Sequence, residues 1–264
     1  MFRLEIGKGI WKFDSGKEGK TVVIMAWMEG EEHGPSDTIR DFIDELNIVS
    51  GKIYYIAAHP LILKKERKQN KKSMNELFID IPKNSTDEDI RVQDIIPFLR
   101  ESDILLTIGY EEKESFFDTK NLHWATFFDT NYIFTGMESL KPERSESYMN
   151  QLGKIGLYLW TGGFMETFIR KNIQNFLLST GNIEGELYLY KHPKTYHLYK
   201  ALRAPNPYFY FAKKWKEVEK IAAKEEIAHY ENMTIRCPFD GIIAFPRIPR
   251  KIGDVMCVLG KKVP

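Results

Sequence analysis

The stretch TVVIMAWM, residues 21–28, is a continuous apolar run, and it decides the fold class. A run of this kind is typical of a strand covered on both faces, because a strand with one wet face alternates apolar and polar residues. Residues 37–46 follow with apolar side chains at helical spacing, and residues 52–58 (KIYYIAA) form a second apolar strand. This order of strand, helix and strand predicts a parallel or mixed sheet.

The same alternation continues outward along the chain. The expected elements are a helix over 87–99, a strand over 104–108, a helix over 146–152, a strand over 156–160 and a helix over 165–178. After Gly181 the pattern changes, and short strand-like segments are separated by turns rich in Pro, Gly and Asn. We therefore expect an α/β domain over residues 1–182, with a mixed, mainly parallel sheet sandwiched by helices, and a small all-β, barrel-like module over residues 183–264.

Composition limits the classes of function. The chain of 264 residues has 43% hydrophobic residues, which excludes a disordered chain. Its 38 basic and 37 acidic residues give a formal net charge of +1, so the overall charge does not favour nucleic acid or an anionic membrane. No apolar run approaches the roughly 18 residues that span a bilayer. These features predict a cytoplasmic protein without a membrane partner, whose two cysteines serve core packing.

Three predicted strands end in segments that resemble known motifs, at the edge where α/β sheets bind ligands. The first is followed by MEGEEHG (residues 28–34), the second by His59-Pro60 and then SMNELF (residues 73–78), and the third ends in TIG (residues 107–109). Their order and spacing resemble the succinylglutamate desuccinylase and aspartoacylase family, whose motifs are HGxE, NPxA with a downstream RxxxxDLNRxF, and DLH. The segment CPFDGIIAFPRIPRKIGDVMCVLG, residues 237–260, is similar to the terminal β module of that family.

The resemblance implies a zinc carboxypeptidase-like fold and a zinc-dependent deacylase, in which a metal-bound water attacks an amide carbonyl. In that family the zinc ligands are the His and Glu of HGxE and the His of DLH. The corresponding positions here are Glu29, Glu32 and Gly109. Only Glu32 matches, and Gly109 has no side chain that could bind a metal.

The positions that the resemblance assigns to substrate binding and to the general base are also substituted. Lys68 takes the place of the Arg that precedes DLNR, and Ser73 replaces the Asp of that motif. Asn75 matches, whereas Glu76 replaces the Arg that would pair with a substrate carboxylate and would repel it instead. Trp160 takes the place of the general-base Glu, and an indole cannot accept a proton.

These substitutions favour a protein that keeps the deacylase fold without the zinc chemistry. Such a protein would need no cofactor, and it would bind a small carboxylate-containing ligand or a protein partner in the old cleft or on its surface. The strongest motivation is Glu29, Gly109 and Trp160 at positions that need His, His and Glu.

The alternative is a metal-dependent amide hydrolase with a rearranged site. Glu29, Glu32 and His33 would bind zinc or another divalent cation, because carboxylates and one imidazole suit such ions. Glu166, which follows Trp160 closely in sequence, is a weak candidate for a relocated base. The simpler interpretation of the acidic cluster is a solvated loop before the helix at 37–46.

Other polar and aromatic segments have simple structural explanations. His59 and His123 could complete a metal site, but each is expected to be a hydrogen-bonded structural residue. The basic segment KKERKQNKK, residues 64–72, could bind an anion, but without interleaved aromatics it is expected to be a solvated loop, which argues against a nucleic-acid partner. The aromatic residues of segment 208–215 are expected at the seam between the α/β domain and the β module.

Overall fold

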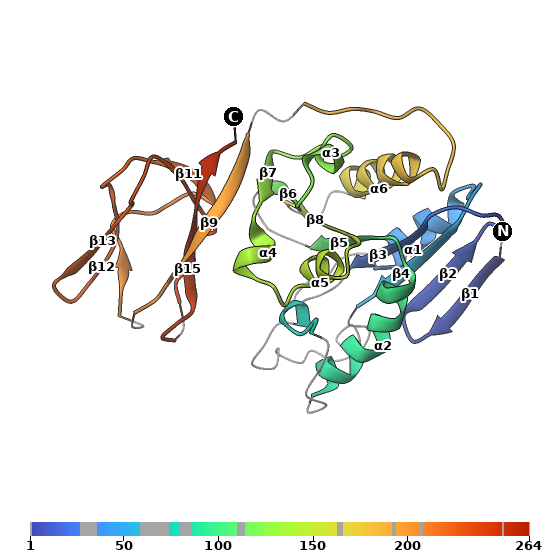
Figure 1. Cartoon of the computed structure of the whole chain (residues 1–264), viewed down its shortest axis with the longest axis horizontal. Coiled ribbons are helices and arrows are strands. Elements are labelled where there is room, and N and C mark those ends of the chain that lie inside the picture. The colour runs from blue at the N-terminus through green and yellow to red at the C-terminus, as the bar shows by residue number, and fades with distance from the viewer. Residues whose placement is uncertain are drawn as a thin grey trace.

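The computed structural model describes residues 2–26, 36–58, 74–79, 86–109, 114–162, 166–191, 194–205, 208–249 and 251–263. Within these residues one mixed sheet of 12 strands runs through the molecule in the order β1-β2-β4-β3-β5-β8-β6-β7-β9-β15-β14-β11. A second sheet has the order β10-β12-β13. Figure 1 shows the helices gathered around the first part of the large sheet and the later strands extending away from it.

The elements have the following bounds. The strands are β1 (Phe2–Gly7), β2 (Ile10–Asp14), β3 (Thr21–Ala26), β4 (Lys52–Ala57), β5 (Ile104–Gly109), β6 (Ser115–Thr119), β7 (Tyr132–Thr135), β8 (Ile155–Thr161), β9 (Thr195–Arg203), β10 (Tyr210–Phe211), β11 (Val218–Ile221), β12 (Glu226–Tyr230), β13 (Met233–Arg236), β14 (Gly241–Ala244) and β15 (Val255–Lys262). The helices are α1 (Ser36–Glu45), the 3₁₀ turn η2 (Met74–Glu76), α2 (Asp87–Glu101), α3 (Leu122–Ala125), α4 (Met137–Leu140), α5 (Ser145–Gln151) and α6 (Glu166–Thr180).

The centre of the sheet is parallel, as the apolar runs predict. Strand β3 lies between β4 and β5 and pairs in parallel with both, and β5 pairs in parallel with β8. Strand β6 then runs antiparallel to β8 and parallel to β7, so the sheet is mixed. The predicted mixed α/β fold, with a C-terminal region of strands, is confirmed.

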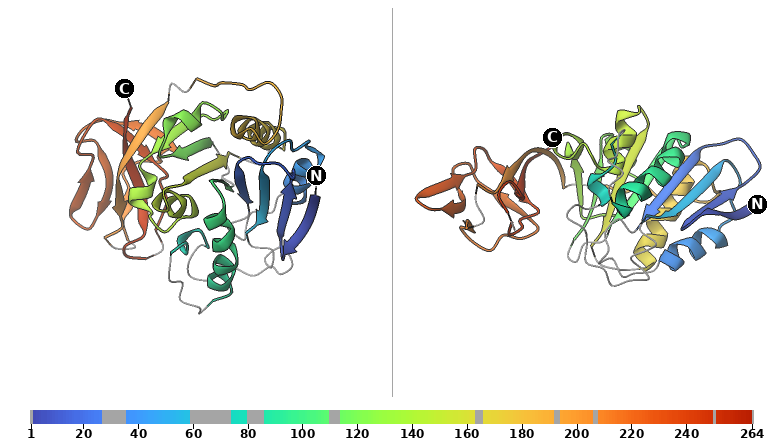
Figure 2. Two further views of the ribbon diagram at one scale, coloured as in Figure 1. Left: turned by 45° about the vertical axis from the view of Figure 1, so that its right-hand side comes forward. Right: turned by 90° about the horizontal axis from the view of Figure 1, so that it is seen from below.

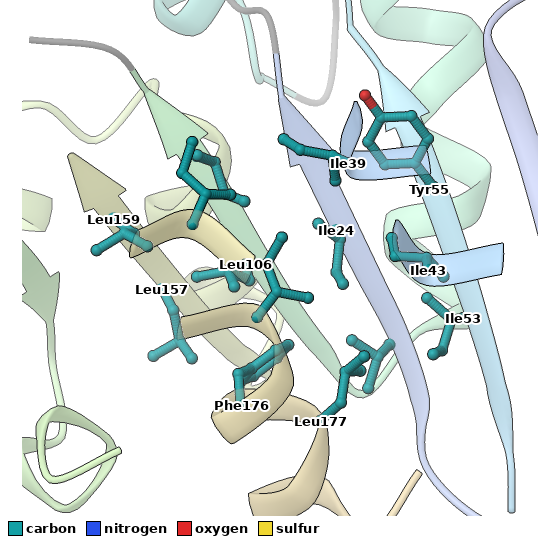
Figure 3. Packing of buried hydrophobic residues seen from close by; sticks show 14 of the residues in the cluster. Ile24, Ile39, Ile43, Ile53, Tyr55, Leu106, Leu157, Leu159, Phe176 and Leu177 are labelled. Atoms are coloured by element: carbon teal, nitrogen blue, oxygen red, sulfur yellow. The ribbon is translucent and has the colours of Figure 1, made fainter. Parts of the chain in front are cut away.

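Helices cover both faces of this sheet because successive side chains of a buried strand point to opposite sides. Ile24 and Leu106 point to the face that α1 and α6 cover, where Ile43 and Phe176 are fully buried (Figure 3). Their neighbours in sequence point to the other face, which α2 and α5 cover with residues such as Leu99 and with Val92, Ile95, Tyr148 and Met149. Figure 2 shows the two helical layers from further directions.

The C-terminal strands continue the sheet. Strand β9 pairs in parallel with β7 and antiparallel with β15, and β14 and β11 follow at the end of the sheet. The expected boundary at residues 182 and 183 falls between α6 and β9, and the β7–β9 pair joins the sheet across it. No helix in the described part of the chain is long and apolar enough to cross a membrane.

The strands from β9 to β15 enclose a hydrophobic core of their own. Phe209 and Trp215 are buried in it beside Cys237 and Cys257, which confirms that both cysteines serve core packing. The seam expected from the aromatic segment 208–215 is therefore wrong for its buried members. The sequence shows which segment is aromatic but not which surface each ring faces, and here the rings fill the β module itself.

The hairpin β1–β2 was not among the elements expected from the sequence. Its strands pair antiparallel around Lys8 and Gly9, and β2 pairs antiparallel with β4. Strand β1 thus forms one edge of the large sheet (Figure 1).

Candidate functional site

The carboxyl ends of β3, β4, β5 and β8 meet at one edge of the sheet, because these strands are parallel neighbours. Several residues singled out in the sequence follow these ends and lie outside the described residues: Glu29, Glu32, His33, His59, Lys68 and Ser73. The backbone of Glu76 belongs to η2, but its side chain is outside the description. The described part of the site consists of β5, β8, β6, η2 and the beginning of α5.

Gly109 ends β5 and lies directly against Tyr158 of β8. A Cβ atom built on Gly109 would lie 2.7 Å from Cε1 of Tyr158, and closer still to its hydroxyl oxygen. Atoms that are not bonded do not approach so closely, so the phenol ring occupies the space in which any larger residue at 109 would begin. The position that the family resemblance assigns to a zinc-binding His is therefore filled by a neighbouring ring.

Trp160 lies on the same face of β8 as Tyr158, two residues further along the strand. Its ring stacks on that of Tyr158, with 3.6 Å between ring centroids, and on that of Phe116 from β6, at 4.2 Å. Phe116 and Trp160 are also paired residues in the antiparallel β6–β8 ladder. The position that the family resemblance assigns to the general base is thus occupied by the middle ring of an aromatic stack.

The guanidinium of Arg144 covers this stack. Its Cζ atom is 4.3 Å from the centroid of the Tyr158 ring and 4.5 Å from that of Trp160. Arg144 Nε lies 2.7 Å from Oε1 of Glu146, and Nη1 lies 3.8 Å from Oδ2 of Asp118. All three charged residues are 3% exposed, which makes this group, the Arg144 cluster (Asp118, Arg144 and Glu146), a buried ionic site in the middle of the fold.

Two carboxyl groups share one cation in the Arg144 cluster. Burial raises the pKa of Asp118 well above its usual range, and the negative charges of Glu146 and Glu138 add to this, whereas Arg144 opposes it. Burial also raises the pKa of Glu146, again against the lowering effect of Arg144. Arg144 lies closer to Glu146 than to Asp118, so the cluster is an Arg144–Glu146 ion pair beside an Asp118 that readily keeps its proton.

Asn75 holds the start of α5 in place. Its Oδ1 accepts hydrogen bonds from the backbone N–H of Ser145, at 3.3 Å, and from the Ser145 hydroxyl, at 3.4 Å. The Ser145 hydroxyl also lies 2.9 Å from Oγ1 of Thr107 on β5. The one residue of the substrate-binding motif that matches the family and is described here is therefore buried and fixes a helix to the sheet.

A close approach of α5 to β8 completes this arrangement. Gly156 of β8 has no Cβ, and a Cβ there would overlap the backbone carbonyl of Glu146. The Gly156 N–H donates to Oδ1 of Asn150 at 3.1 Å. Only glycine lets the helix lie this near to the strand, which brings the Arg144 cluster against the aromatic stack.

The remaining candidates lie elsewhere. Glu166 begins α6 and pairs with Arg170 at 2.8 Å; α6 covers the face of the sheet opposite to Trp160. His123 is exposed and contacts the ring of Phe127 edge-on at 5.1 Å. Among the described residues no group of three or more His, Cys, Asp or Glu side chains is arranged to hold a metal ion.

The Arg144 cluster was missed by sequence reasoning. Asp118 lies in β6, whereas Arg144 and Glu146 lie at the start of α5, and charged residues are usually exposed. One signal was available, because Asp118 interrupts the apolar strand SFFDT, residues 115–119, on the side that faces Tyr158. A carboxylate inside a buried strand requires a partner, and Arg144 at the beginning of a helix is that partner.

The contact between Gly109 and Tyr158 makes a testable prediction. Gly109→Ala should lower the free energy of unfolding by about 1–3 kcal/mol, because the new methyl group must displace the phenol ring. In the Tyr158→Ala background the same substitution should cost clearly less, giving a coupling energy in a double-mutant cycle measured by urea denaturation. Gly7→Ala is the control, since a Cβ there meets Ile10 Cδ1 at an ordinary 3.6 Å. If Gly109→Ala lowers the free energy of unfolding equally in the wild type and in the Tyr158→Ala background, the contact is contradicted.

The mixed sheet, its two helical layers and the strand-rich C-terminal region define a class of α/β protein in which the strand ends carry the site. The fold is that of the succinylglutamate desuccinylase and aspartoacylase proteins. Succinylglutamate desuccinylase from Vibrio cholerae matches with a TM-score of 0.80 and 15% sequence identity, over 97% of this chain and 86% of that chain. Two similar structures are the enzyme from Vibrio parahaemolyticus (TM-score 0.79, 13% identity, 97% and 86% covered) and a succinylglutamate desuccinylase/aspartoacylase from Rhodobacter sphaeroides (TM-score 0.72, 16% identity, 97% and 89% covered).

The likeness extends over nearly the whole of this chain and establishes the fold. No protein-family model matches the sequence, and none of the curated proteins matches it either. Sequence motifs and fold therefore agree on the scaffold, and the chemistry has to be argued from the residues of this chain.

Proposed function

We propose that this protein is a non-catalytic member of the deacylase-like proteins, which binds a small carboxylate-containing ligand or a protein partner. The observation that carries the proposal is the aromatic stack of Phe116, Trp160 and Tyr158 under Arg144. It occupies the positions at which the family resemblance requires a general base and a zinc-binding His.

The chemistry of these residues supports binding over hydrolysis. A zinc hydrolase needs three protein ligands around an open coordination position, and Gly109 contributes none. Activation of water also needs a base within hydrogen-bond reach, and the indole of Trp160 is a donor only. The buried carboxyl groups of Asp118 and Glu146 are held against Arg144, so they are poor substitutes for a base exposed to a substrate.

The proposal predicts an inactive protein under conditions in which an active succinylglutamate desuccinylase, the positive control, turns over. Protein purified without chelators is expected to carry zinc far below one equivalent by mass spectrometry of the metal. It is also expected to release no acyl group from N-succinylglutamate or N-acetylaspartate. Stoichiometric zinc together with acyl release would overturn the proposal.

The same experiment tests the rearranged metal site. Should zinc and hydrolysis both be found, Glu32→Ala and His33→Ala decide whether Glu29, Glu32 and His33 form the site, since loss of a ligand should remove both signals. Glu18→Ala, in a loop on the exposed surface, is the matched control.

A further inference from the structure

Strand β1 is an edge strand whose exposed face is apolar. Phe2 is 77% exposed, Leu4 61% and Ile6 37%, and these residues alternate with Arg3 and Glu5. Strand β1 has only one neighbour, β2, within the described sheet (Figure 1). Every second residue of such a strand turns its backbone N–H and C=O groups outward, where they can pair with another strand.

The two faces of β1 differ in chemistry. Arg3 pairs with Asp44 of α1 and lies over the ring of Phe13, so Arg3 and Glu5 point to the face that α1 covers. The apolar residues of β1 point to the opposite face. A partner strand would have to offer apolar residues on one face and complementary charges on the other.

The sequence of β1 meets both requirements itself. In an antiparallel pair with a two-fold axis at Leu4, each Leu4 faces Leu4 of the second copy, each Arg3 faces Glu5, and Phe2 faces Ile6. Two Arg–Glu pairs then lie on one face, and six apolar side chains cluster on the other. A guanidinium has several N–H donors, so Arg3 can keep the ion pair within its own chain and still donate to the second copy.

The register of the hairpin favours this arrangement. The pairing of β1 with β2 is regular from Phe2 to Glu5, and its register shift lies beyond Glu5. The Leu4–Leu4 and Arg3–Glu5 pairs of the two-fold arrangement therefore fall in the regular part of the strand, whereas Ile6 of the outer pair lies in the register shift.

The other edge of the sheet differs from β1. Strand β11 has four residues, Val218–Ile221, and Ile221 is buried. Glu219 lies 2.9 Å from Lys213 and accepts a hydrogen bond from the backbone N–H of Lys216, so its carboxylate is committed within the chain. Short strands discourage pairing, whereas β1 is longer and self-complementary.

We infer that two copies of this protein associate through β1, forming one continuous sheet across a two-fold axis. The contact is small, so the association is weak, with a dissociation constant in roughly the micromolar range. It does not involve β3, β5 or β8, and it is independent of the function proposed above.

Charge reversal separates this pairing from any other contact. Arg3→Glu alone sets two carboxylates opposite each other in both cross-strand pairs, and Glu5→Arg alone sets two guanidinium groups opposite each other. Each single variant should therefore lose at least about tenfold in association constant, measured by analytical ultracentrifugation over a concentration series. An equimolar mixture of the two variants restores opposite charges in every pair, so it should form a heterodimer with about the wild-type affinity.

Two controls accompany the charge reversal. Lys17→Glu and Glu18→Arg make the same changes of charge in the exposed loop after β2 and should leave association unchanged. Circular dichroism of each variant confirms that it is folded. A wild-type protein that stays monomeric at all concentrations would overturn the inference, as would single variants that dimerise normally or a mixture that fails to associate.

Discussion

Arg144→Met is expected to lower the free energy of unfolding by about 3–5 kcal/mol near neutral pH, because it leaves two buried carboxyl groups without their cation. Asp118 and Glu146 are both 3% exposed, so water cannot replace the guanidinium. The loss is measured by urea denaturation followed by circular dichroism. Arg236→Met is the matched control: Arg236 pairs with Glu226 on the surface, where such a pair contributes at most about 1 kcal/mol.

The loss should depend on pH in a defined direction. Burial raises the pKa of both carboxyl groups in the folded protein, and Arg144 opposes that rise. A carboxyl group with a raised pKa contributes its stability below the pKa of the unfolded chain, about 4, and this contribution is lost as the pH rises through the folded value. Without Arg144 the folded-state pKa values of both carboxyl groups rise further. The difference in free energy of unfolding between Arg144→Met and the wild type should therefore be small near pH 4 and grow toward pH 8.

A triple variant tests whether the charges cause the loss. Arg144→Met combined with Asp118→Asn and Glu146→Gln removes all three ionisable groups of the cluster, so it should recover a substantial part of the stability and lose the steep pH dependence. A single Arg144→Met variant within about 1 kcal/mol of wild type at every pH would contradict the role of Arg144 as the partner of these carboxyl groups.

Trp160→Ala is expected to lower the free energy of unfolding by about 3 kcal/mol, because it removes the middle ring of the aromatic stack. The indole contacts Phe116, Tyr158 and the guanidinium of Arg144, and all of these contacts are lost with the ring. Trp160→Phe keeps a ring in the stack and should cost less than about 1.5 kcal/mol. Both are measured by thermal and urea denaturation.

The contact between Trp160 and Arg144 can be measured directly. In a double-mutant cycle, Trp160→Ala and Arg144→Met should be non-additive, since each removes a surface on which the other rests. Tyr210→Ala provides an aromatic control, because Tyr210 is 62% exposed. A cost below about 1 kcal/mol for Trp160→Ala would mean that this position does not belong to the packed core, and it would weaken the argument against a catalytic cleft.

The elements that the sequence predicts well are those with the strongest apolar periodicity. The buried runs at β3, β4, β5 and β8 have the pattern of covered strands, and the helices between them follow from their spacing. The hairpin β1–β2 was not predicted, although Phe2, Leu4 and Ile6 alternate with Arg3 and Glu5 as in a strand with one apolar face. The prediction relied on continuous apolar runs, which mark strands covered on both faces, and β1 is mostly exposed.

The sequence allowed two positions of the candidate site to be assigned, but not the side chains that surround them. Gly109 and Trp160 could be assigned because they lie at fixed distances from strand ends, and a motif records such distances. The Arg144 cluster depends on which side chains two separate elements, β6 and the start of α5, bring into contact, and local sequence does not encode that. Asp118 gave a signal only as a charge in an apolar strand.

Strand β9 pairs with β7 on one side and with β15 on the other, so one hydrogen-bonded sheet continues from the deacylase-like part into the C-terminal strands. A hinge between two bodies needs a few residues free to change their backbone angles, and a shared strand provides no such point. The ligand binding proposed above is therefore not expected to move the two parts against each other, because such a movement would break the β7–β9–β15 ladder. Under that proposal, a ligand is recognised by local adjustment of side chains on a fixed sheet.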